Sequence, residues 1–198
     1  MMFRFAILVA LFALIVPTWG QVTSDERSKA ADEILRKVRR LDLMNQILPL
    51  VLTKSQYAKV LPTIEKARAA VKKQEQIEYD FLSKLSPKID KALKEAVDNG
   101  KVPGNEVINE TWATFQTLGI MRKAVADDNV DKVFEVFKAT LNAGQIKTAA
   151  NSVNVKAFDP NADPKTMGDD AKLRIYIRLI VLDPLAYDLL LQLSRKAE

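Results

Sequence analysis

Apolar residues recur at steps of three and four along almost the whole chain, which is the spacing of one face of an α-helix. The first such segment covers about residues 25–48, and Pro49 is expected to end or kink it because proline lacks a backbone N–H. The inward stripe of this helix is predicted to comprise Ala31, Ile34, Leu35, Val38, Leu41, Met44 or Asn45, and Leu48.

The second helix is predicted to begin at a capping box. Thr53 can accept a hydrogen bond from the backbone N–H of Gln56, whose side chain reaches back to the N–H of Thr53. Leu52 precedes the cap and is expected to pack on Tyr57, as in a hydrophobic staple. This combination is a strong signal for the start of a helix.

Beyond the cap, the apolar pattern continues to Asn99-Gly100, a typical helix end. Pro62 is expected to bend this long helix, and Pro87 either to kink it or to begin a new one. Its buried stripe is predicted to comprise Val60, Ile64, Ala67, Val71, Phe81, Leu85, Ile89 and Leu93.

Further helices are predicted along the second half of the chain. One covers about residues 106–126, with Val107, Thr111, Phe115, Leu118, Met121 and Val125 inward. Another follows an Asp127-Asp128-Asn129 cap, and a short one to about residue 150 follows a second capping box in Leu141, Asn142 and Gln145.

The C-terminal part is predicted to be a loop, residues 151–170, followed by helices within residues 171–198. Residues 171–182 alternate as a strand would but also fit a buried helix, and no second strand-like segment is present to pair with. We interpret them as helix, with a last helix after Asp183-Pro184. The predicted fold is all-α: a long bent helical hairpin plus additional C-terminal helices, in a single domain covering residues 21–198.

The first twenty residues have the pattern of a secretory signal peptide. Arg4 precedes the apolar run Phe5–Val16, and small residues near Gly20 suit cleavage after that residue. The run is too short to span a membrane, which takes about 20 residues. No cysteine follows the run, which excludes a lipoprotein anchor. We therefore expect a periplasmic or secreted protein without an integral membrane span.

Composition narrows the chemistry further. The chain of 198 residues has a net charge of +5 and contains neither cysteine nor histidine, which excludes disulfides and thiolate sites and removes the commonest general base and metal ligand. Glu75 and Glu78 lie one turn apart, but such pairs are common on solvated helices. We predict no catalytic residues, no cofactor, no metal and no nucleic-acid partner.

One loop resembles a calcium site in part. Asp159, Asn161 and Asp163 have the alternate spacing of an EF-hand loop, and Asp170 falls at its twelfth position. However, Pro164 stands where the EF-hand requires glycine, so a capped, solvated loop is the preferred interpretation.

The elements Leu52-Thr53-Lys54-Ser55-Gln56 and Leu141-Asn142-Ala143-Gly144-Gln145 resemble the repeated motif of the bacterial periplasmic L-T-x-x-Q family, the Spy/CpxP group. The second element departs from the motif at Asn142, which keeps the capping role. The resemblance covers residues 42–150. It implies long bent helices in hairpins that form a cradle-shaped antiparallel dimer, and a role in envelope stress, in some members as ATP-independent chaperones.

Two functions follow from these observations. The first is a chaperone-type protein that binds unfolded or acidic protein segments. The binding residues would be Tyr57 and a basic line of Lys59, Lys66 and Lys73, and the protein could act as a homodimer. The alternative is a structural or adaptor protein of the envelope without client binding, in which the same lysines form a solvated helix face. The two differ in whether a contiguous apolar patch is exposed.

Export gives the first testable prediction. When the gene is expressed in a bacterial host, the mature protein should begin at Gln21 and fractionate with the periplasm or the medium, because the apolar run directs secretion. N-terminal sequencing checks this. Recovery of an intact Met1 in the cytoplasmic fraction would contradict it.

Overall fold

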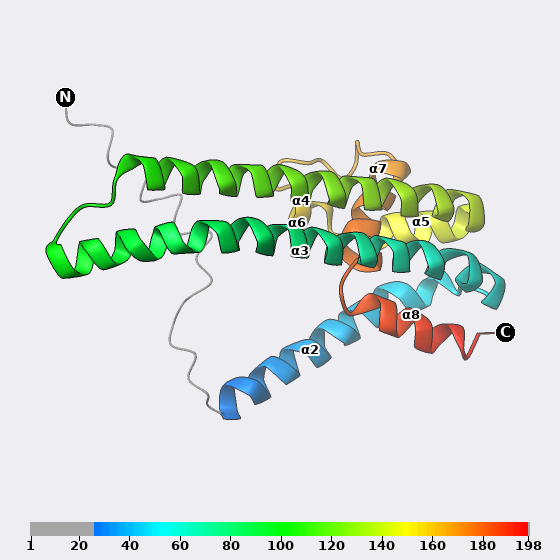
Figure 1. The fold of residues 1–198 in the computed structure, drawn as a ribbon. Helices are drawn as coiled ribbons and strands as arrows, with labels where there is room; N and C mark the ends of the chain where they lie inside the picture. Colours follow the sequence, from blue (N-terminus) through cyan, green and yellow to red (C-terminus); the bar gives the residue numbers. More distant parts are fainter. Residues whose placement is uncertain (1–25, 198) are drawn as a thin grey trace. The chain divides into compact units, whose positions relative to one another are not determined.

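The computed structural model describes residues 26–197 and shows an all-α protein with no strand in that range, as the sequence predicts (Figure 1). The predicted signal peptide, residues 1–20, lies outside the described residues. In chain order the elements are α2 (Glu26–Ile47), the 3-10 turn η1 (Leu48–Leu50), α3 (Lys54–Asn99), α4 (Asn105–Thr140), α5 (Ala143–Ser152), α6 (Val155–Phe158), α7 (Asp169–Tyr176), the π-helical turn η2 (Ile177–Val181) and α8 (Ala186–Ser194).

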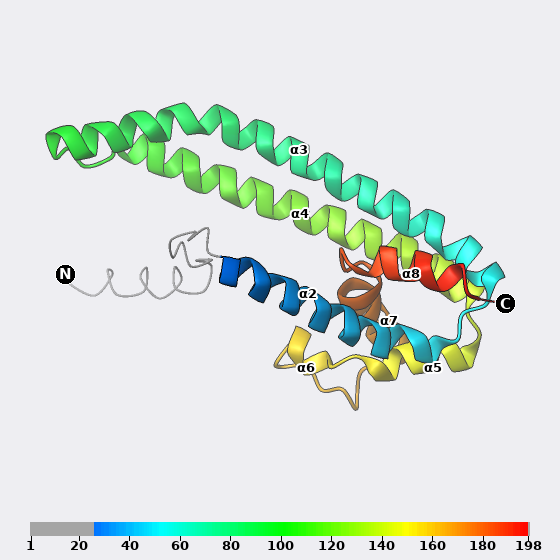
Figure 2. The ribbon, with the colours of Figure 1, turned by 90° about the horizontal axis from the view of Figure 1, so that it is seen from below.

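The chain divides into two compact units, residues 1–39 and 40–198. In the first unit the described residues, 26–39, are the N-terminal part of α2. In the second unit, α3 and α4 form an antiparallel hairpin, and α5, α7 and α8 pack at one of its ends (Figure 2). We call this end the base and the opposite end, at residues 100–104, the tip. The hairpin between them, residues 70–126, is the arm.

The tip follows from local backbone chemistry. Gly100 adopts a left-handed conformation with φ of 63°, which suits glycine because it has no Cβ, and its N–H donates to the Ala96 carbonyl at 3.0 Å. Residues 101–104 then reverse the chain, and α4 begins after Gly104. With 46 residues, α3 is roughly 69 Å long at 1.5 Å per residue.

Polar contacts between α3 and α4 fix the register of the hairpin. Near the base, the Asn129 side-chain amide donates to the Ala67 carbonyl at 3.2 Å. In the middle of the arm, the Arg122 guanidinium forms a two-pronged ion pair with Glu78. Toward the tip, Lys88 Nζ contacts the Glu110 carboxylate at 2.6 and 2.8 Å. A shift of one residue would break all three contacts.

The hydrophobic core lies at the base. It combines Leu43 and Ile47 from α2 with residues of α3, α4, α5, α7, η2 and α8. Tyr176 is at its centre, fully buried, and its hydroxyl donates to the Gln46 carbonyl at 3.1 Å. Burial raises the pKa of this phenol, so the hydroxyl stays protonated and available as a donor. Apolar burial here supplies most of the stabilisation of the fold.

The C-terminal segments mostly follow the prediction. Residues 171–182 are helical and not a strand, and they end in the π-helical turn η2, where the Leu182 N–H donates to the Ile177 carbonyl at 2.9 Å. The segment predicted as a loop, residues 151–170, contains the short helix α6. After it, the Asp183 side chain accepts from the Leu185 N–H at 2.9 Å and leads the chain into α8.

One predicted helix break is wrong. Helix α4 is continuous through Asp127-Asp128-Asn129, because Asn129 is buried against α3 and its amide binds the Ala67 carbonyl instead of capping a helix. Helix α3 continues through Pro62, as predicted, and of the two alternatives at Pro87 it excludes the start of a new helix. Figure 2 shows that α3 curves along its length, which accommodates both prolines within one helix.

The predicted inward stripe of α2 is also wrong. Ile34, Leu35, Val38 and Leu41 are exposed, whereas Leu43 and Ile47, which the prediction missed, are buried. Within the part of α2 that belongs to the second unit, Leu43 and Ile47 share the side that meets the base core, and Leu41 lies on the other side of the helix.

The electrostatic contact in the arm gives a prediction on pH. The hydrogen bond from Arg122 holds the pKa of Glu78 below its ordinary value of 4.5. The pair therefore stabilises the folded state fully above pH 4.5, and this contribution is lost as the pH falls through the lowered value. We expect Glu78→Gln to be less stable than wild type at pH 7 and to lose less stability between pH 5 and 3.

Urea denaturation at each pH measures the free energy of unfolding. Glu75→Gln is the matched control, since Glu75 is one turn away, exposed and without an ion-pair partner among residues 26–197. If the free energy of unfolding changed with pH equally in Glu78→Gln and wild type, the stabilising role of the Glu78–Arg122 pair would be contradicted.

Candidate functional site

The two predicted capping boxes are present and meet each other at the base. Thr53 accepts from the Gln56 N–H at 3.3 Å, and Asn142 accepts from the Gln145 N–H at 2.9 Å. Each glutamine side-chain oxygen in turn accepts the N–H of its own cap residue at 3.0 Å. Both helices, α3 and α5, thus begin with satisfied backbone donors.

The glutamine amides also bind one another. Gln56 Nε2 lies 2.9 Å from Gln145 Oε1, and Gln145 Nε2 lies 3.1 Å from Gln56 Oε1. Gln56 Nε2 further donates to the Thr140 carbonyl at 3.0 Å, and Gln145 Nε2 to the Leu50 carbonyl at 2.8 Å. Two residues 89 positions apart therefore connect the starts of α3 and α5 with the ends of η1 and α4, and hold the base of the hairpin closed.

The other residues of these motifs belong to the core. Leu52 and Leu141 are buried, and Tyr57 is only 5 % exposed, with a pKa raised by burial. This placement removes Tyr57 from the surface, so it cannot contact a client in this fold. The burial of Tyr57 could have been predicted from the sequence, because the residue on which a hydrophobic staple packs is covered by the staple residue.

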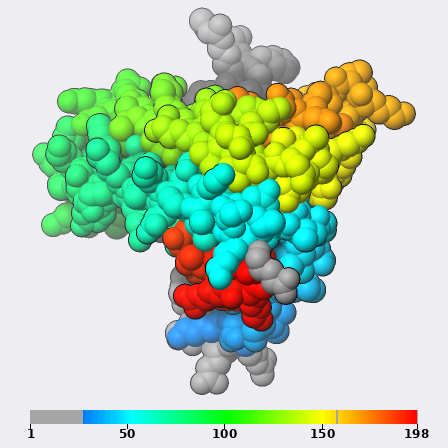
Figure 3. All heavy atoms as spheres, turned by 90° about the vertical axis from the view of Figure 1, so that its right-hand side faces the viewer, coloured from blue at the N-terminus to red at the C-terminus, as the bar shows by residue number. Residues whose placement is uncertain are grey.

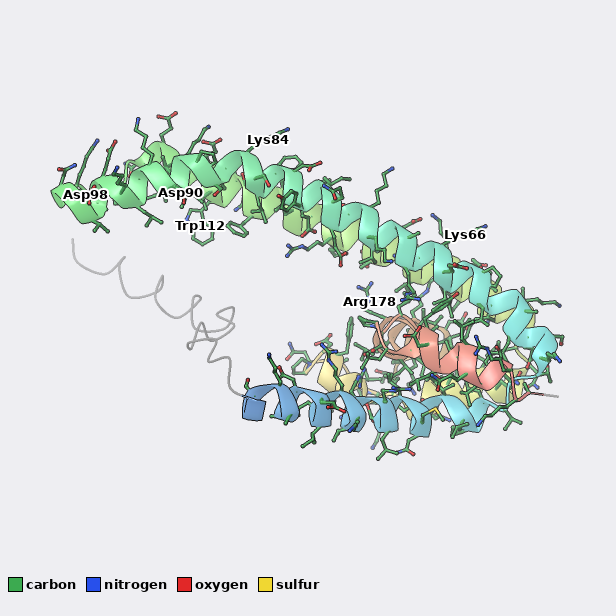
Figure 4. All side chains as sticks on the ribbon, turned by 60° about the horizontal axis from the view of Figure 1, so that its bottom comes forward. Lys66, Lys84, Asp90, Asp98, Trp112 and Arg178 are labelled. Atoms are coloured by element: carbon green, nitrogen blue, oxygen red, sulfur yellow. The ribbon has the colours of Figure 1, made fainter. Side chains whose placement is uncertain are left out.

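Five lysines form a line on α3. Lys59, Lys66 and Lys73, singled out from the sequence, are exposed, and helical spacing places Lys84 and Lys91 on the same side. None of the five has an ion-pair partner among the residues that the structure describes. Figure 4 shows Lys66 and Lys84 projecting from one side of the hairpin and Trp112 from the other.

The side that carries Trp112 is covered at the base. The Arg68 guanidinium of α3 stacks on the Tyr187 ring of α8, with 4.3 Å between the guanidinium carbon and the ring centroid. On α4, Arg174 of α7 stacks on Phe134 at 4.0 Å, and Asp127 and Asp131 form ion pairs with Arg178 and Arg174. The C-terminal helices thus cover this side as far as Asp127.

Beyond that point the same side is exposed and apolar. Helical spacing continues the covered flank of each helix along the arm, with about 100° per residue. On and beside this flank lie several exposed large residues, of which six are here called the arm face: Tyr79, Leu82, Leu93, Ile108, Trp112 and Phe115. Trp112 is 46 % and Phe115 52 % exposed. The predictions that Leu93 and Phe115 are inward are wrong, as are those for Val71 and Phe81. Among residues 26–197 the arm consists of α3 and α4 alone, and no third element in that range covers these side chains.

The space-filling view looks onto the base end (Figure 3). The α3–α4 hairpin extends away from the C-terminal helices in this view, in agreement with the restriction of the core to the base. The arm itself buries few large side chains; Gln74, Leu85 and Leu118 are its buried members.

Several carboxylates noted in the sequence have structural contacts. Glu78 pairs with Arg122, and the lowered pKa of this carboxyl is the opposite of what a general acid near neutral pH requires. In the calcium-like loop, Asp159 accepts the Asn161 N–H at 2.9 Å and Asp163 accepts the Lys165 N–H at 3.0 Å, as in capped turns. Within residues 26–197, no group of three or more acidic side chains is placed to hold a metal ion.

The comparisons with known proteins add no relative. A comparison of the sequence with models of known protein families found no match, and searches among curated proteins and among solved structures found none either. No helix of the described chain is long and apolar enough to cross a membrane.

The glutamine pair gives a prediction on stability. Thr53→Ala and Asn142→Ala should each lower the free energy of unfolding by about 0.5–2 kcal/mol, since each removes one cap. Gln56→Ala and Gln145→Ala should each cost more than the cap variant of the same motif, because they remove a cap acceptor and also strand a carbonyl at the base.

A double-mutant cycle separates the contact between the two glutamines from the caps. The Gln56→Ala/Gln145→Ala variant should be more stable than the sum of the single effects predicts, with a coupling of about 0.5–3 kcal/mol. Thr53→Ala combined with Thr148→Ala is the control and should be additive. If the losses in free energy of unfolding caused by Gln56→Ala and Gln145→Ala were additive in urea denaturation, a direct contact between the two side chains would be contradicted.

Proposed function

We propose that this chain is an exported, non-enzymatic binding protein that holds apolar segments of non-native proteins on the arm face. The observation that carries the proposal is the group of three aromatic and three aliphatic side chains exposed on one side of the arm. Large exposed apolar patches on soluble proteins mark interaction sites. Aromatic residues are common at such sites because they bury much area at a low cost in side-chain entropy.

The construction of the arm supports this role. Its two helices are joined by the Glu78–Arg122 and Lys88–Glu110 ion pairs, so the arm keeps its register without a thick hydrophobic core. The apolar side chains are therefore displayed on a defined surface. An extended apolar segment could contact residues of both helices at once, and several weak contacts of this kind give reversible holding.

The lysine line supports the encounter step. It lies on the opposite side of α3 from the arm face, so its charges would attract acidic regions of a client while leaving the apolar face unoccupied. Such exposed charges act over about 8 Å at physiological ionic strength. Their contribution is expected in the rate of capture and not in the lifetime of the complex.

The resemblance of the two capping motifs to the Spy/CpxP group supports the same class of function. In this proposal the protein acts in the periplasm or outside the cell, and the glutamine contact keeps the hairpin closed at its base while the arm binds. No nucleotide is required, because holding needs only apolar contact. The adaptor alternative differs in a single respect: it requires no client on the arm face.

A holdase assay tests the proposal. The chain Gln21–Glu198 is added at increasing ratio to a chemically unfolded client without nucleotide, and aggregation is followed by light scattering. We expect suppression by wild type and at least a fivefold higher half-effective ratio for Phe115→Asp, which places a charge on the arm face. The matched control is Val102→Asp, because Val102 is 81 % exposed but lies in the tip loop, off the arm face.

Trp112 supplies a direct readout, since it is the only tryptophan in residues 21–198. Its emission should shift to the blue when a tryptophan-free client binds, because the indole leaves water. Reversal of Lys59, Lys66 and Lys73 to glutamate, or added salt, should slow this change. No suppression by excess wild-type protein would overturn the proposal in favour of the adaptor, and equal activity of Phe115→Asp and wild type would remove the arm face as its site.

A further inference from the structure

A cleft lies at the base where α6, α7 and η2 meet α4. Its floor is apolar, since Val130 of α4 and Ile175 of α7 line it and are buried. Phe158, the last residue of α6, also lines it and is 46 % exposed. The volume of the cleft is about 400 Å³, within the range of about 300–1,000 Å³ that is typical of small-molecule sites. All of these residues belong to the second unit, residues 40–198.

Two ion pairs join the charged residues that line the cleft. Arg174 of α7 pairs with Asp131, and Arg178 of η2 pairs with Asp127. The two arginines are four residues apart, as are the two aspartates on α4, so the pairs lie about one helical turn apart. Figure 4 shows Arg178 at the base, on the side of the C-terminal helices that faces the hairpin. Two guanidinium groups and two carboxylates therefore share one small space.

Aromatic rings lie against both arginines. The guanidinium carbon of Arg174 is 4.0 Å from the centroid of the Phe134 ring, and that of Arg178 is 6.0 Å from the centroid of the Phe158 ring. A ring beside a guanidinium limits its movement, and the five N–H groups form a planar fork that matches a carboxylate. Within residues 26–197 each ion pair joins one guanidinium nitrogen to one aspartate oxygen, so each fork has N–H groups for a second acceptor.

The backbone at Arg178 is unusual as well. This residue lies in the π-helical turn η2, where the Leu182 N–H donates to the Ile177 carbonyl, five positions back in the chain. Turns of this kind are rare and frequently lie at functional sites. The rare turn therefore coincides with one of the two arginines that line the cleft.

The charges of the lining select the kind of ligand. The two arginines and the two aspartates cancel, so a simple anion such as phosphate would meet two carboxylates as well as two guanidinium groups. A ligand with one charge of each sign can use both. Asp127 already has two cationic partners, Lys123 at 2.5 Å and Arg178. Asp131 pairs with Arg174 through Oδ1 and is 63 % exposed, so it is the carboxylate with room for a further cation.

We propose that the cleft binds a free α-amino acid with an apolar side chain. The ligand carboxylate binds the fork of Arg178, and the ligand ammonium binds Asp131. Its side chain rests on the apolar floor and against Phe158. An apolar amino acid offers these three contacts together, whereas a simple anion or cation does not. Exposed ion pairs contribute little to stability, so sharing the two pairs with a ligand costs the fold little.

Titration of the chain Gln21–Glu198 with L-phenylalanine, followed by protein NMR, tests the binding. Amide signals of residues 127–131 and 174–178 should shift, with a dissociation constant on the order of 0.1–1 mM, because the ligand is small and the cleft is open. N-acetyl-L-phenylalanine keeps the carboxylate without the ammonium, and L-phenylalanine amide keeps the ammonium without the carboxylate. Each should bind at least roughly tenfold more weakly, since one charged contact is lost.

Two variants assign the roles of the charged residues. Arg178→Gln should weaken the binding of L-phenylalanine at least roughly tenfold, because the fork for the carboxylate is lost. Asp131→Asn, which is nearly isosteric, should weaken L-phenylalanine but not N-acetyl-L-phenylalanine, because the acetylated ligand has no ammonium. Arg195→Gln is the matched control, since Arg195 is exposed and lies outside the cleft. Circular dichroism spectra equal to that of wild type show that the variants are folded.

Three results would overturn the proposal. They are an NMR spectrum that L-phenylalanine leaves unchanged up to its solubility limit, binding that Arg178→Gln leaves intact, and binding of N-acetyl-L-phenylalanine as tight as that of L-phenylalanine. The last result would assign the cleft to the carboxyl end of a peptide instead. None of these results bears on client holding by the arm.

Discussion

The reciprocal hydrogen bonds between Gln56 and Gln145 are the constraint on which the geometry of the base depends. Each amide completes a cap on its own helix, binds its counterpart and satisfies a backbone carbonyl of the opposite segment. A glutamine has two amide hydrogens and one carbonyl oxygen, and nearly all of this capacity is used. No other residue type could cap a helix and bridge to a second cap with the same reach, which explains why both motifs end in glutamine.

The contrast between base and arm follows from the number of layers. At the base, α2, α5, α7 and α8 supplement the hairpin, and a contiguous core forms. Along the arm, two helices of the described part of the chain meet, so each can bury one narrow stripe, and the contacts that hold them are in part ionic. Apolar residues beyond that stripe stay in water. The same sequence pattern thus produces a core at one end and an exposed apolar surface at the other.

Much of the local structure could be predicted from the sequence, and the tertiary arrangement much less. Both capping boxes, the long helix up to Gly100 and the helical state of residues 171–182 depend on neighbours in the chain, and these predictions are confirmed. Periodicity identifies an apolar side but not what covers it, so Val38 and Phe115 were assigned inward although both are exposed. The sequence around Asn129 is typical of a helix cap. Its side chain instead donates to the Ala67 carbonyl, 62 positions away in the sequence, and a contact at that separation cannot be read from neighbouring residues.

The contact of Tyr176 with the Gln46 carbonyl joins segments 130 residues apart and bears on the order in which the chain folds. The α3–α4 hairpin brings together segments that follow each other directly, so it can form early. Closing the base requires the last helices, which are synthesised last and leave the ribosome last. Because long loops must close before distant contacts form, we expect base formation to be the slow step. Until then Leu43 and Ile47 remain in water, and the incomplete chain is itself a protein with unprotected apolar segments.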